Sequence, residues 1–228
     1  MTKRTITVRR DVLSQSTADA AAFRERLGRR GTLVVNLLAS PGAGKTTLLE
    51  ATARRLGGGR MAALVGDIAT DRDAKRLEPL APTVQLTTGG ACHLELPLVQ
   101  RGLAELGEPQ VAFLFIENVG NLVCPSSHDL GEHLRVIVLS TSEGDDKPAK
   151  YPKAFRTSHA LVISKLDLLE HVPFSISAAC DDARAIQPRL SVFPICAPAG
   201  EGMDAWCRYL EEERLRRLDI HHDAQVAG

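Results

Sequence analysis

The chain has 228 residues, 44% of them hydrophobic and 25% charged, and its 28 basic residues equal its 28 acidic residues. This is the composition of an ordinary globular protein large enough for one α/β domain, and the balanced charge excludes a bulk positive field for nucleic acid or an anionic membrane. Its polar start does not resemble a signal peptide, and its longest apolar run is too short to span a bilayer, so we expect a cytoplasmic protein.

The predicted elements begin after residues 1–16, which show no clear period and are expected to form a loose arm. A helix is predicted from Thr17 until Gly28 and Gly31 end it. The apolar run 33–38 follows as a strand buried on both faces. Further strands are expected over 61–65, 83–86, 111–116, 134–140, 161–164 and 192–195, with helices over 46–56, 94–106 and 203–218.

Strands that alternate with helices predict a doubly wound α/β fold, with a mostly parallel sheet and helices on both faces. No internal repeat or low-complexity linker interrupts the chain. We therefore expect an N-terminal arm and helix over 1–31, one P-loop nucleotide-hydrolase domain over 32–218, and a frayed tail over 219–228.

Segment 39–46, Ala-Ser-Pro-Gly-Ala-Gly-Lys-Thr, fits the phosphate-binding P-loop pattern with alanine at the first glycine position. Gly42 and Gly44 allow backbone N–H groups to curl around a phosphate, and the following helix adds its dipole. We expect Lys45 to bridge the terminal phosphates and Thr46 to bind Mg²⁺. The predicted nucleotide-binding residues here are Gly42, Ala43, Gly44, Lys45, Thr46 and Thr47.

Acidic residues close two other predicted strands. Glu117 ends the run 111–116, and Asp67 follows the run 61–65. Ligands of open α/β sheets bind at the carboxyl ends of strands, where an acid can orient Mg²⁺ or the attacking water. We therefore predict Lys45, Asp67 and Glu117 as catalytic residues and Thr46, Asp67 and Glu117 as magnesium ligands, although a solvated loop acid is the alternative interpretation of Glu117.

A Lys-x-Asp sequence at Lys165 and Asp167 closes the strand over 161–164. The usual GTPase pattern is Asn-Lys-x-Asp, and here Ser164 replaces the asparagine. A carboxylate such as that of Asp167 accepts the N1 and N2 hydrogens of guanine, which adenine cannot supply together, while the lysine stem covers the base. Guanine preference is therefore predicted, and a strand-end salt bridge is the alternative.

The adjacent pair Cys92 and His93 lies at the predicted start of a helix, where a thiol pKa would be lowered, and Cys124 follows the Glu117 loop. Thiolates and imidazoles bind Zn²⁺ and Ni²⁺. Three ligands do not close a four-coordinate site, but a symmetric dimer would double them. Spacing alone leaves buried, non-ligating cysteines as an alternative.

Other thiols and imidazoles have simpler interpretations. Cys180, Cys196 and Cys207 lie among apolar neighbours, which favours packing. His128 is close enough to Cys124 to be an accessory ligand, although a solvated loop histidine is the simpler interpretation.

Four strings of residues resemble the HypB/UreG family of P-loop metallochaperones, in particular the hydrogenase nickel-incorporation GTPases called HypB. They are Ser-Pro-Gly-Ala-Gly-Lys-Thr-Thr at 40–47, Thr-Gly-Gly-Ala-Cys-His-Leu at 88–94, Phe-Ile-Glu-Asn-Val-Gly-Asn-Leu-Val-Cys-Pro at 115–125, and the segment 143–152. The resemblance spans residues 33 to 170 in order.

This resemblance implies a GTPase that dimerises on GTP, with Mg²⁺ as cofactor and Ni²⁺ or Zn²⁺ bound at the dimer interface by Cys92, His93 and Cys124. It implies that a lysine of the 146–150 loop, for which we choose Lys150, reaches the nucleotide of the facing subunit. The implied partners are a HypA-like zinc protein and the large subunit of NiFe-hydrogenase.

The chain also departs from the family pattern. It has no N-terminal Cys-x-x-Cys-Gly-Cys motif and no histidine-rich stretch, so metal storage is not expected. A urease GTPase of the UreG type matches less well, because Ser126 follows Cys124-Pro125 where that group has histidine. A small-molecule P-loop kinase and a metal-binding structural protein with a degenerate nucleotide site are the alternatives from other classes.

Overall fold

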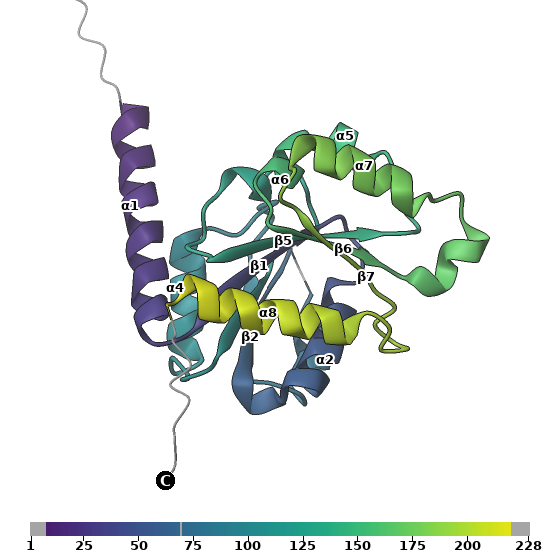
Figure 1. Cartoon of the computed structure of the whole chain (residues 1–228). Helices are drawn as coiled ribbons and strands as arrows, with labels where there is room; N and C mark the ends of the chain where they lie inside the picture. The colour runs from purple at the N-terminus through teal and green to yellow at the C-terminus, as the bar shows by residue number, and fades with distance from the viewer. Residues whose placement is uncertain (1–7, 69, 220–228) are drawn as a thin grey trace, which may run out of the picture.

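A seven-stranded parallel sheet forms the centre of the molecule (Figure 1). The computed structural model describes residues 8–68 and 70–219. Its strands follow the spatial order β3-β2-β4-β1-β5-β6-β7, and every neighbouring pair is parallel. They are β1 (Leu33–Ala39), β2 (Met61–Asp67), β3 (Thr83–Thr87), β4 (Phe113–Glu117), β5 (Leu134–Ser140), β6 (Ala160–Ser164) and β7 (Ser191–Pro194).

Helices connect the strands and cover both faces of the sheet. The α-helices are α1 (Val8–Arg29), α2 (Lys45–Leu56), α3 (Arg72–Leu77), α4 (Leu96–Glu105), α5 (Lys147–Lys150), α6 (Pro152–Arg156), α7 (Ile176–Ile186) and α8 (Met203–Arg217). Short 3₁₀ helices are η1 (Gly58–Arg60), η2 (Pro125–Ser127) and η3 (Leu166–His171). In the described part of the chain, none of these helices is both long and apolar enough to cross a membrane.

Successive residues of the central strand enter different cores, as the two-residue period of a strand requires. Leu33 and Leu37 of β1 pack with α2, α3 and α8 on one face. On the other face, Val34 packs with α1 and α4, and Leu38 packs with α6 and α7. Both faces are therefore covered, which confirms the predicted doubly wound sheet.

The first helix begins earlier than the sequence predicted. Helix α1 starts at Val8, so the expectation of a loose arm over residues 1–16 is wrong from that residue onward. Residues 15–19 are all exposed, and Ala20 is the first described residue of α1 to be buried. An exposed helical segment such as 15–19 needs no apolar stripe, which is why periodicity missed it. Residues 1–7 and 220–228 lie outside the described residues, including nearly all of the predicted tail.

The strand order places the functional segments at one edge of the sheet. From β1 the chain runs to β2 and β3, returns through β4 beside β1, and then continues outward through β5, β6 and β7. The carboxyl end of β1 therefore lies where the winding direction reverses, which is where open α/β sheets bind ligands. The P-loop follows β1 directly, and Glu117, Asp67 and Ser164 end β4, β2 and β6.

Candidate functional site

The P-loop joins β1 to α2 in a backbone conformation that requires glycine. Gly42 and Gly44 have φ angles of 73° and 91°, in the left-handed region that side chains with a Cβ rarely adopt. Helix α2 begins immediately afterwards at Lys45, and the Lys45 side chain is buried. The loop therefore presents a helix N-terminus and a buried cation to one position, which suits a polyphosphate.

Thr46 and Glu117 meet beneath this loop. The Thr46 hydroxyl donates to Glu117 Oε1 over 2.9 Å, and both residues are buried. Glu117 Oε2 is also buried but has no hydrogen-bond partner. Burial raises the pKa of Glu117 to about 7, while the charge of nearby Lys45 opposes that rise. An orphaned buried carboxylate oxygen beside a threonine hydroxyl fits the two predicted magnesium ligands, because Mg²⁺ prefers such oxygens.

The third predicted magnesium ligand, Asp67, ends the neighbouring strand. Register pairs Glu117 of β4 with Val65 of β2, so Asp67 lies two residues further along the adjacent strand. Its Oδ1 accepts the backbone N–H of Thr70 over 2.9 Å. Asp67 is thus at the predicted edge of the sheet, and its role in magnesium binding stays a prediction.

Two lysines of α5 lie in different environments. Lys147 donates to the Ser40 hydroxyl over 3.2 Å and pairs with Glu143 at 3.1 Å, so it contacts the P-loop of its own chain. Lys150, the residue chosen from the sequence, pairs with Asp146 at 2.5 Å, and its side chain is 60% exposed. Lys150 therefore points to the surface, and its reach toward a facing subunit stays a prediction.

The base loop is bonded directly to the P-loop through the unusual serine. The Ser164 hydroxyl donates to the Ala43 carbonyl oxygen over 2.6 Å. Next to it, Lys165 has a φ of 60°, a strained conformation for a residue other than glycine. The Thr141 hydroxyl holds it there by donating to the Lys165 carbonyl over 2.7 Å. Serine in place of asparagine therefore still connects the base loop to the phosphate loop.

Asp167 projects from η3 at the exposed end of this loop. The thiol of Cys196 donates to Asp167 Oδ1 over 3.4 Å. Cys196 is buried as predicted, but it also touches the predicted guanine-reading carboxylate, which sequence reasoning missed because the contact spans 29 positions. The chain after Cys196 lines a cleft of about 530 Å³ together with Thr47 of α2.

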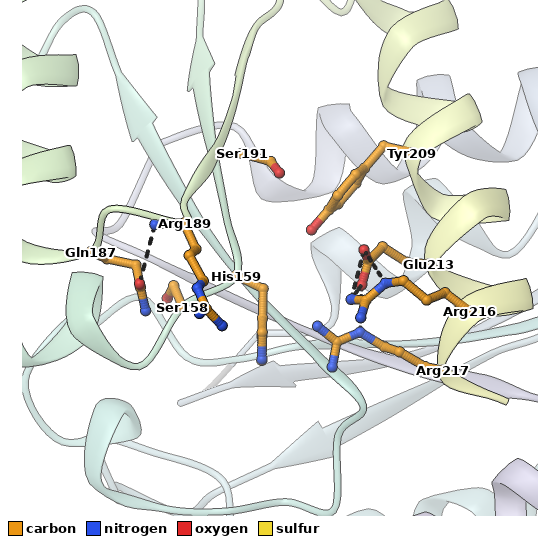
Figure 2. Close-up of a pocket in the computed structure, with 9 residues that line it drawn as sticks. All are labelled: Ser158, His159, Gln187, Arg189, Ser191, Tyr209, Glu213, Arg216 and Arg217. Carbon is orange, nitrogen blue, oxygen red and sulfur yellow. Dashed lines mark hydrogen bonds and ion pairs between the residues drawn. The ribbon is translucent and has the colours of Figure 1, made fainter.

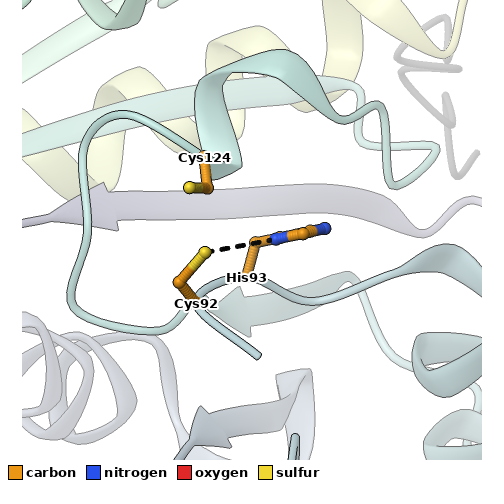
Figure 3. Close-up of side chains that lie close together, drawn as sticks. All are labelled: Cys92, His93 and Cys124. Carbon is orange, nitrogen blue, oxygen red and sulfur yellow. Dashed lines mark hydrogen bonds between the residues drawn. The ribbon is translucent and has the colours of Figure 1, made fainter. Parts of the chain in front are cut away.

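Cys92, His93 and Cys124 come together at the same edge of the sheet (Figure 3). One ligand atom from each of them lies within 4.8 Å of the others. The Cys92 sulfur is 3.7 Å from His93 Nδ1, and His93 Nε2 is buried without a hydrogen bond, 3.9 Å from a Glu95 oxygen. Two thiols and an imidazole converging in this way fit a thiophilic divalent cation such as Ni²⁺ or Zn²⁺.

The expected low pKa of Cys92 is wrong. Helix α4 begins at Leu96, so Cys92 and His93 belong to the preceding loop and lie outside the first helical turn. Hydrogen bonding to the Cys124 thiol instead raises the pKa of Cys92. Burial lowers the pKa of His93, with a further contribution from the charge of His128. Both shifts favour the uncharged forms of Cys92 and His93.

The loop that carries Cys92 crosses the end of β2 to reach the end of β4. A Cβ on Gly66 would lie 2.8 Å from the Leu94 side chain and 3.0 Å from the Glu117 carbonyl oxygen, so a larger residue would force this crossing to shift. The Leu94 N–H then donates to Asn118 Oδ1 over 3.3 Å. Asn118 is buried and also donates to Asn36 of β1. The nucleotide strands thereby fix the position of the metal-ligating loop.

Segment 117–124 connects the two sites. A Cβ on Gly120 would lie 2.9 Å from Pro41 Cα, and Asn121 forms an antiparallel bridge with Ala39 at the end of β1. The Asn121 amide also donates to the Cys92 carbonyl over 3.3 Å. One short segment thus carries Glu117 at the phosphate site, lies against the P-loop, and ends in the metal-site residue Cys124.

A separate cavity of about 280 Å³ lies at the opposite edge of the sheet (Figure 2). Its lining includes Arg189 and the end of α8, where Arg216 and Arg217 both bind Glu213. Ser191, the first residue of β7, places this cavity at the amino ends of the strands. It therefore takes no part in the nucleotide and metal sites.

Comparisons with known proteins agree with this geometry. A family profile described as "CobW/HypB/UreG, nucleotide-binding domain" matches residues 33–194. A hydrogenase maturation factor HypB from Azotobacter vinelandii is 42% identical over 223 residues, which cover 97% of this chain and 74% of the relative. A hydrogenase/urease maturation factor HypB from Helicobacter hepaticus is 38% identical over 227 residues, covering 97% and 93%. The crystal structure of HypB from Helicobacter pylori in complex with nickel superposes with a TM-score of 0.85 at 36% identity, covering 91% of this chain and 99% of that chain.

Proposed function

Because the chain belongs to the CobW/HypB/UreG family, we propose that it is a GTP hydrolase that inserts nickel during the maturation of NiFe-hydrogenase. The observation that carries this proposal is the continuity of segment 117–124, which has Glu117 against the P-loop threonine and Cys124 in the metal cluster. The relative whose structure is described as a nickel complex supports nickel as the cargo.

Hydrolysis in this proposal is positioning and charge neutralisation. Lys45 and the P-loop N–H groups hold the terminal phosphates, while Thr46 and Glu117, with Asp67 nearby, hold Mg²⁺. When bound, Mg²⁺ neutralises charge on the phosphoryl oxygens. The unpartnered Glu117 Oε2 supports this assignment, since a buried carboxylate oxygen without a hydrogen bond calls for a cation or an ordered water.

Guanine is the base that the loop after β6 suits. Asp167 offers an acceptor pair to N1 and N2 of guanine, and the stem of Lys165 lies over the base plane. The Ser164–Ala43 hydrogen bond supports this reading, because it keeps the base loop and the P-loop at a fixed spacing even without the usual asparagine. Adenine has a bare N1 acceptor and cannot make the same pair of hydrogen bonds.

Nucleotide state controls the metal through segment 117–124. Gly120 touches Pro41 of the P-loop, so ordering this loop around a γ-phosphate moves Asn121 and Cys124 relative to Cys92. Nickel affinity at the cluster therefore differs between GTP and GDP states. Equal affinity in both states would contradict this coupling.

A second copy of the chain completes the metal site. Three donor atoms within 4.8 Å leave a four-coordinate cation short of ligands, and a two-fold axis through this partly accessible cluster supplies the same donors again. In the GTP-bound dimer, the exposed Lys150 reaches the nucleotide of the facing subunit. A HypA-like zinc protein and the hydrogenase large subunit are the partners that exchange nickel with this dimer.

Sedimentation tests the proposal directly. The protein is run with GDP or with a non-hydrolysable GTP analogue, each with and without Ni²⁺, beside a Cys92→Ala variant. We expect a dimer with the GTP analogue that binds nickel only when Cys92 is present. A monomer in every state without thiol-dependent nickel would remove the metallochaperone function and leave a nucleotide hydrolase.

A further inference from the structure

His128 lies between the two segments that carry the metal ligands. Its ring stacks on that of His93, with centroids 3.8 Å apart and an interplanar angle of 20°. Its Nδ1 lies 2.9 Å from the carbonyl oxygen of Cys124, so Nδ1–H is the donor, because a carbonyl only accepts. One side chain thus touches both the ligand imidazole and the backbone of a ligand cysteine.

The stacked geometry separates His128 from the ligands themselves. The nitrogen lone pairs of an imidazole lie in the plane of its ring. Because the two stacked rings are nearly parallel, their lone pairs lie in separate planes and do not point toward one shared position. The Nδ1 atom of His128 is also occupied by the Cys124 carbonyl. The group of mutually close donor atoms consists of Cys92, His93 and Cys124 without His128. His128 therefore supports the ligands of the cluster in place of joining them.

A buried ion pair holds His128 in this position from below. The Arg135 guanidinium donates to the His128 carbonyl over 2.8 Å and to the Ser126 carbonyl over 3.2 Å. Arg135 in turn bonds the buried carboxylate of Glu132, with its Nε 2.6 Å from Glu132 Oε1. The backbone of the His128 turn is therefore attached to β5 by a charged group that has little freedom to move.

The same network reaches the other ligand segment. Glu132 Oε1 accepts the amide of Asn36 over 3.3 Å, Asn36 accepts the amide of Asn118, and Asn118 accepts the N–H of Leu94 next to His93. The chain of hydrogen bonds closes at the top through the His128–His93 stack. One continuous network of hydrogen bonds thus holds both ligand segments, and His128 is the part of this network nearest the cation site.

We propose that His128 is a positioning residue of the metal site. It sets the plane of the His93 ring by stacking and sets the turn at Cys124 through its Nδ1–H, so that the imidazole and the Cys124 sulfur converge before a cation arrives. This inference rests on the proposed function, since it concerns the same nickel cluster. Groups that orient ligands in this way are worth about 10- to 100-fold in metal affinity.

Two complementary substitutions separate the two contacts. His128→Phe keeps a ring for the stack but removes the donor to Cys124, whereas His128→Asn keeps a donor nitrogen at the same number of bonds but removes the ring. Ni²⁺ alone is titrated into the full chain, and the thiolate-to-nickel charge-transfer absorption reports both affinity and geometry. We expect about a tenfold weaker affinity and an altered absorption band in each variant, with an unchanged number of nitrogen neighbours in X-ray absorption spectra.

Matched controls make the outcome unambiguous. His171→Phe makes the same substitution at an exposed histidine outside the cluster and should bind nickel as the unaltered chain does. Thermal unfolding of each variant establishes that the fold persists. If both His128 variants give the affinity and absorption of the unaltered chain, the positioning role is wrong, and loss of one nitrogen neighbour would make His128 a ligand and equally overturn it. If Cys92→Ala binds nickel normally, the failure is that of the cluster and the proposed function, because that variant leaves His128 in place.

Discussion

The phosphate region and the metal cluster share one edge of the sheet but are built differently. Lys45, Thr46 and Glu117 are buried and come from the ends of regular elements, and Thr46 already donates a hydrogen bond to Glu117. Cys92 and Cys124 lie in loops that remain at least partly accessible, and their thiols share a hydrogen bond. The phosphate region is thus built from buried ends of strand and helix, and the metal cluster from accessible loops.

This difference indicates which contacts determine the geometry of the metal cluster. Strand ends are rigid because every strand is paired on both sides in the centre of the sheet, whereas the ligand loops take their geometry from contacts with those ends. In the proposed mechanism, a change at the phosphates moves the ligand loops while the sheet stays fixed. A variant that impairs one region should therefore leave the other region intact, so that its binding can still be measured.

The largest expected effect is the loss of hydrolysis in Lys45→Ala. Removing the one buried cation of the P-loop takes away a preorganised charge at the transferred phosphoryl group, so the rate of GTP hydrolysis should fall roughly a thousandfold. Phosphate release measures the rate, and nickel titration without nucleotide should still detect the Cys92 cluster in the same variant. Rapid hydrolysis by this variant would show that the phosphates bind elsewhere.

The next largest effect is expected in the metal cluster, for Cys92→Ala. One of the three converging donor atoms disappears, and the hydrogen bond to the Cys124 thiol disappears with it, so nickel affinity should weaken more than about a hundredfold, beyond the cost of losing a supporting group. Equilibrium dialysis measures the affinity, and Cys180→Ala, a partly buried thiol on α7, is the matched control. Similar losses in both variants would show that the cluster is not the nickel site.

Asp167→Asn tests the base end of the nucleotide region. An amide replaces one acceptor oxygen by a donor, which suits the N1–H and C2 carbonyl of xanthine better than the two donors of guanine. We expect about a hundredfold weaker GTP binding and a gain for the xanthosine nucleotide, measured by competition with a fluorescent nucleotide. An unchanged GTP affinity would mean that Asp167 serves only as the partner of Cys196.

The nucleotide region follows from local sequence pattern more completely than the metal region does. A P-loop needs only a strand, a glycine turn and a helix in succession, and strand-end acids follow from the apolar runs before Glu117 and Asp67. The set Cys92, His93 and Cys124 came from resemblance, because spacing alone left two interpretations open. Its convergence in space agrees with that set.

What the sequence did not predict depends on contacts between distant segments. The stack of His128 on His93 spans 35 positions, and the bond from Ser164 to Ala43 spans 121. Neither has a period or a local motif. The helix expected from Leu94 begins instead at Leu96, since the loop must first cross β2 above Gly66. Tertiary packing decided these features, and single-sequence patterns carry no record of it.

The smallest expected effect concerns the contact between β1 and the residue before β5, in the sheet that supports both regions. His133 precedes β5, and its Nδ1 accepts the N–H of Val34 in β1 over 3.0 Å, which requires an unprotonated nitrogen. Burial lowers the pKa of His133 from 6.5 to about 4. Above pH 6.5 the ring is neutral in both the folded and the unfolded chain, so protonation contributes nothing to stability there. Between pH 6.5 and about 4 only the unfolded chain gains the proton, and the free energy of unfolding should therefore fall as the pH falls.

His133→Asn isolates this contribution, because its Oδ1 can accept the Val34 N–H without a titratable group. The loss of unfolding free energy between pH 6.5 and 4.5 should be about 1 to 3 kcal/mol smaller in this variant than in the unaltered chain, by denaturant titration at each pH. His171→Asn, at an exposed position, should keep the original slope. Parallel slopes for all three proteins would show that His133 titrates equally in the folded and the unfolded chain, and its buried contact with Val34 would then contribute nothing to the pH dependence of stability.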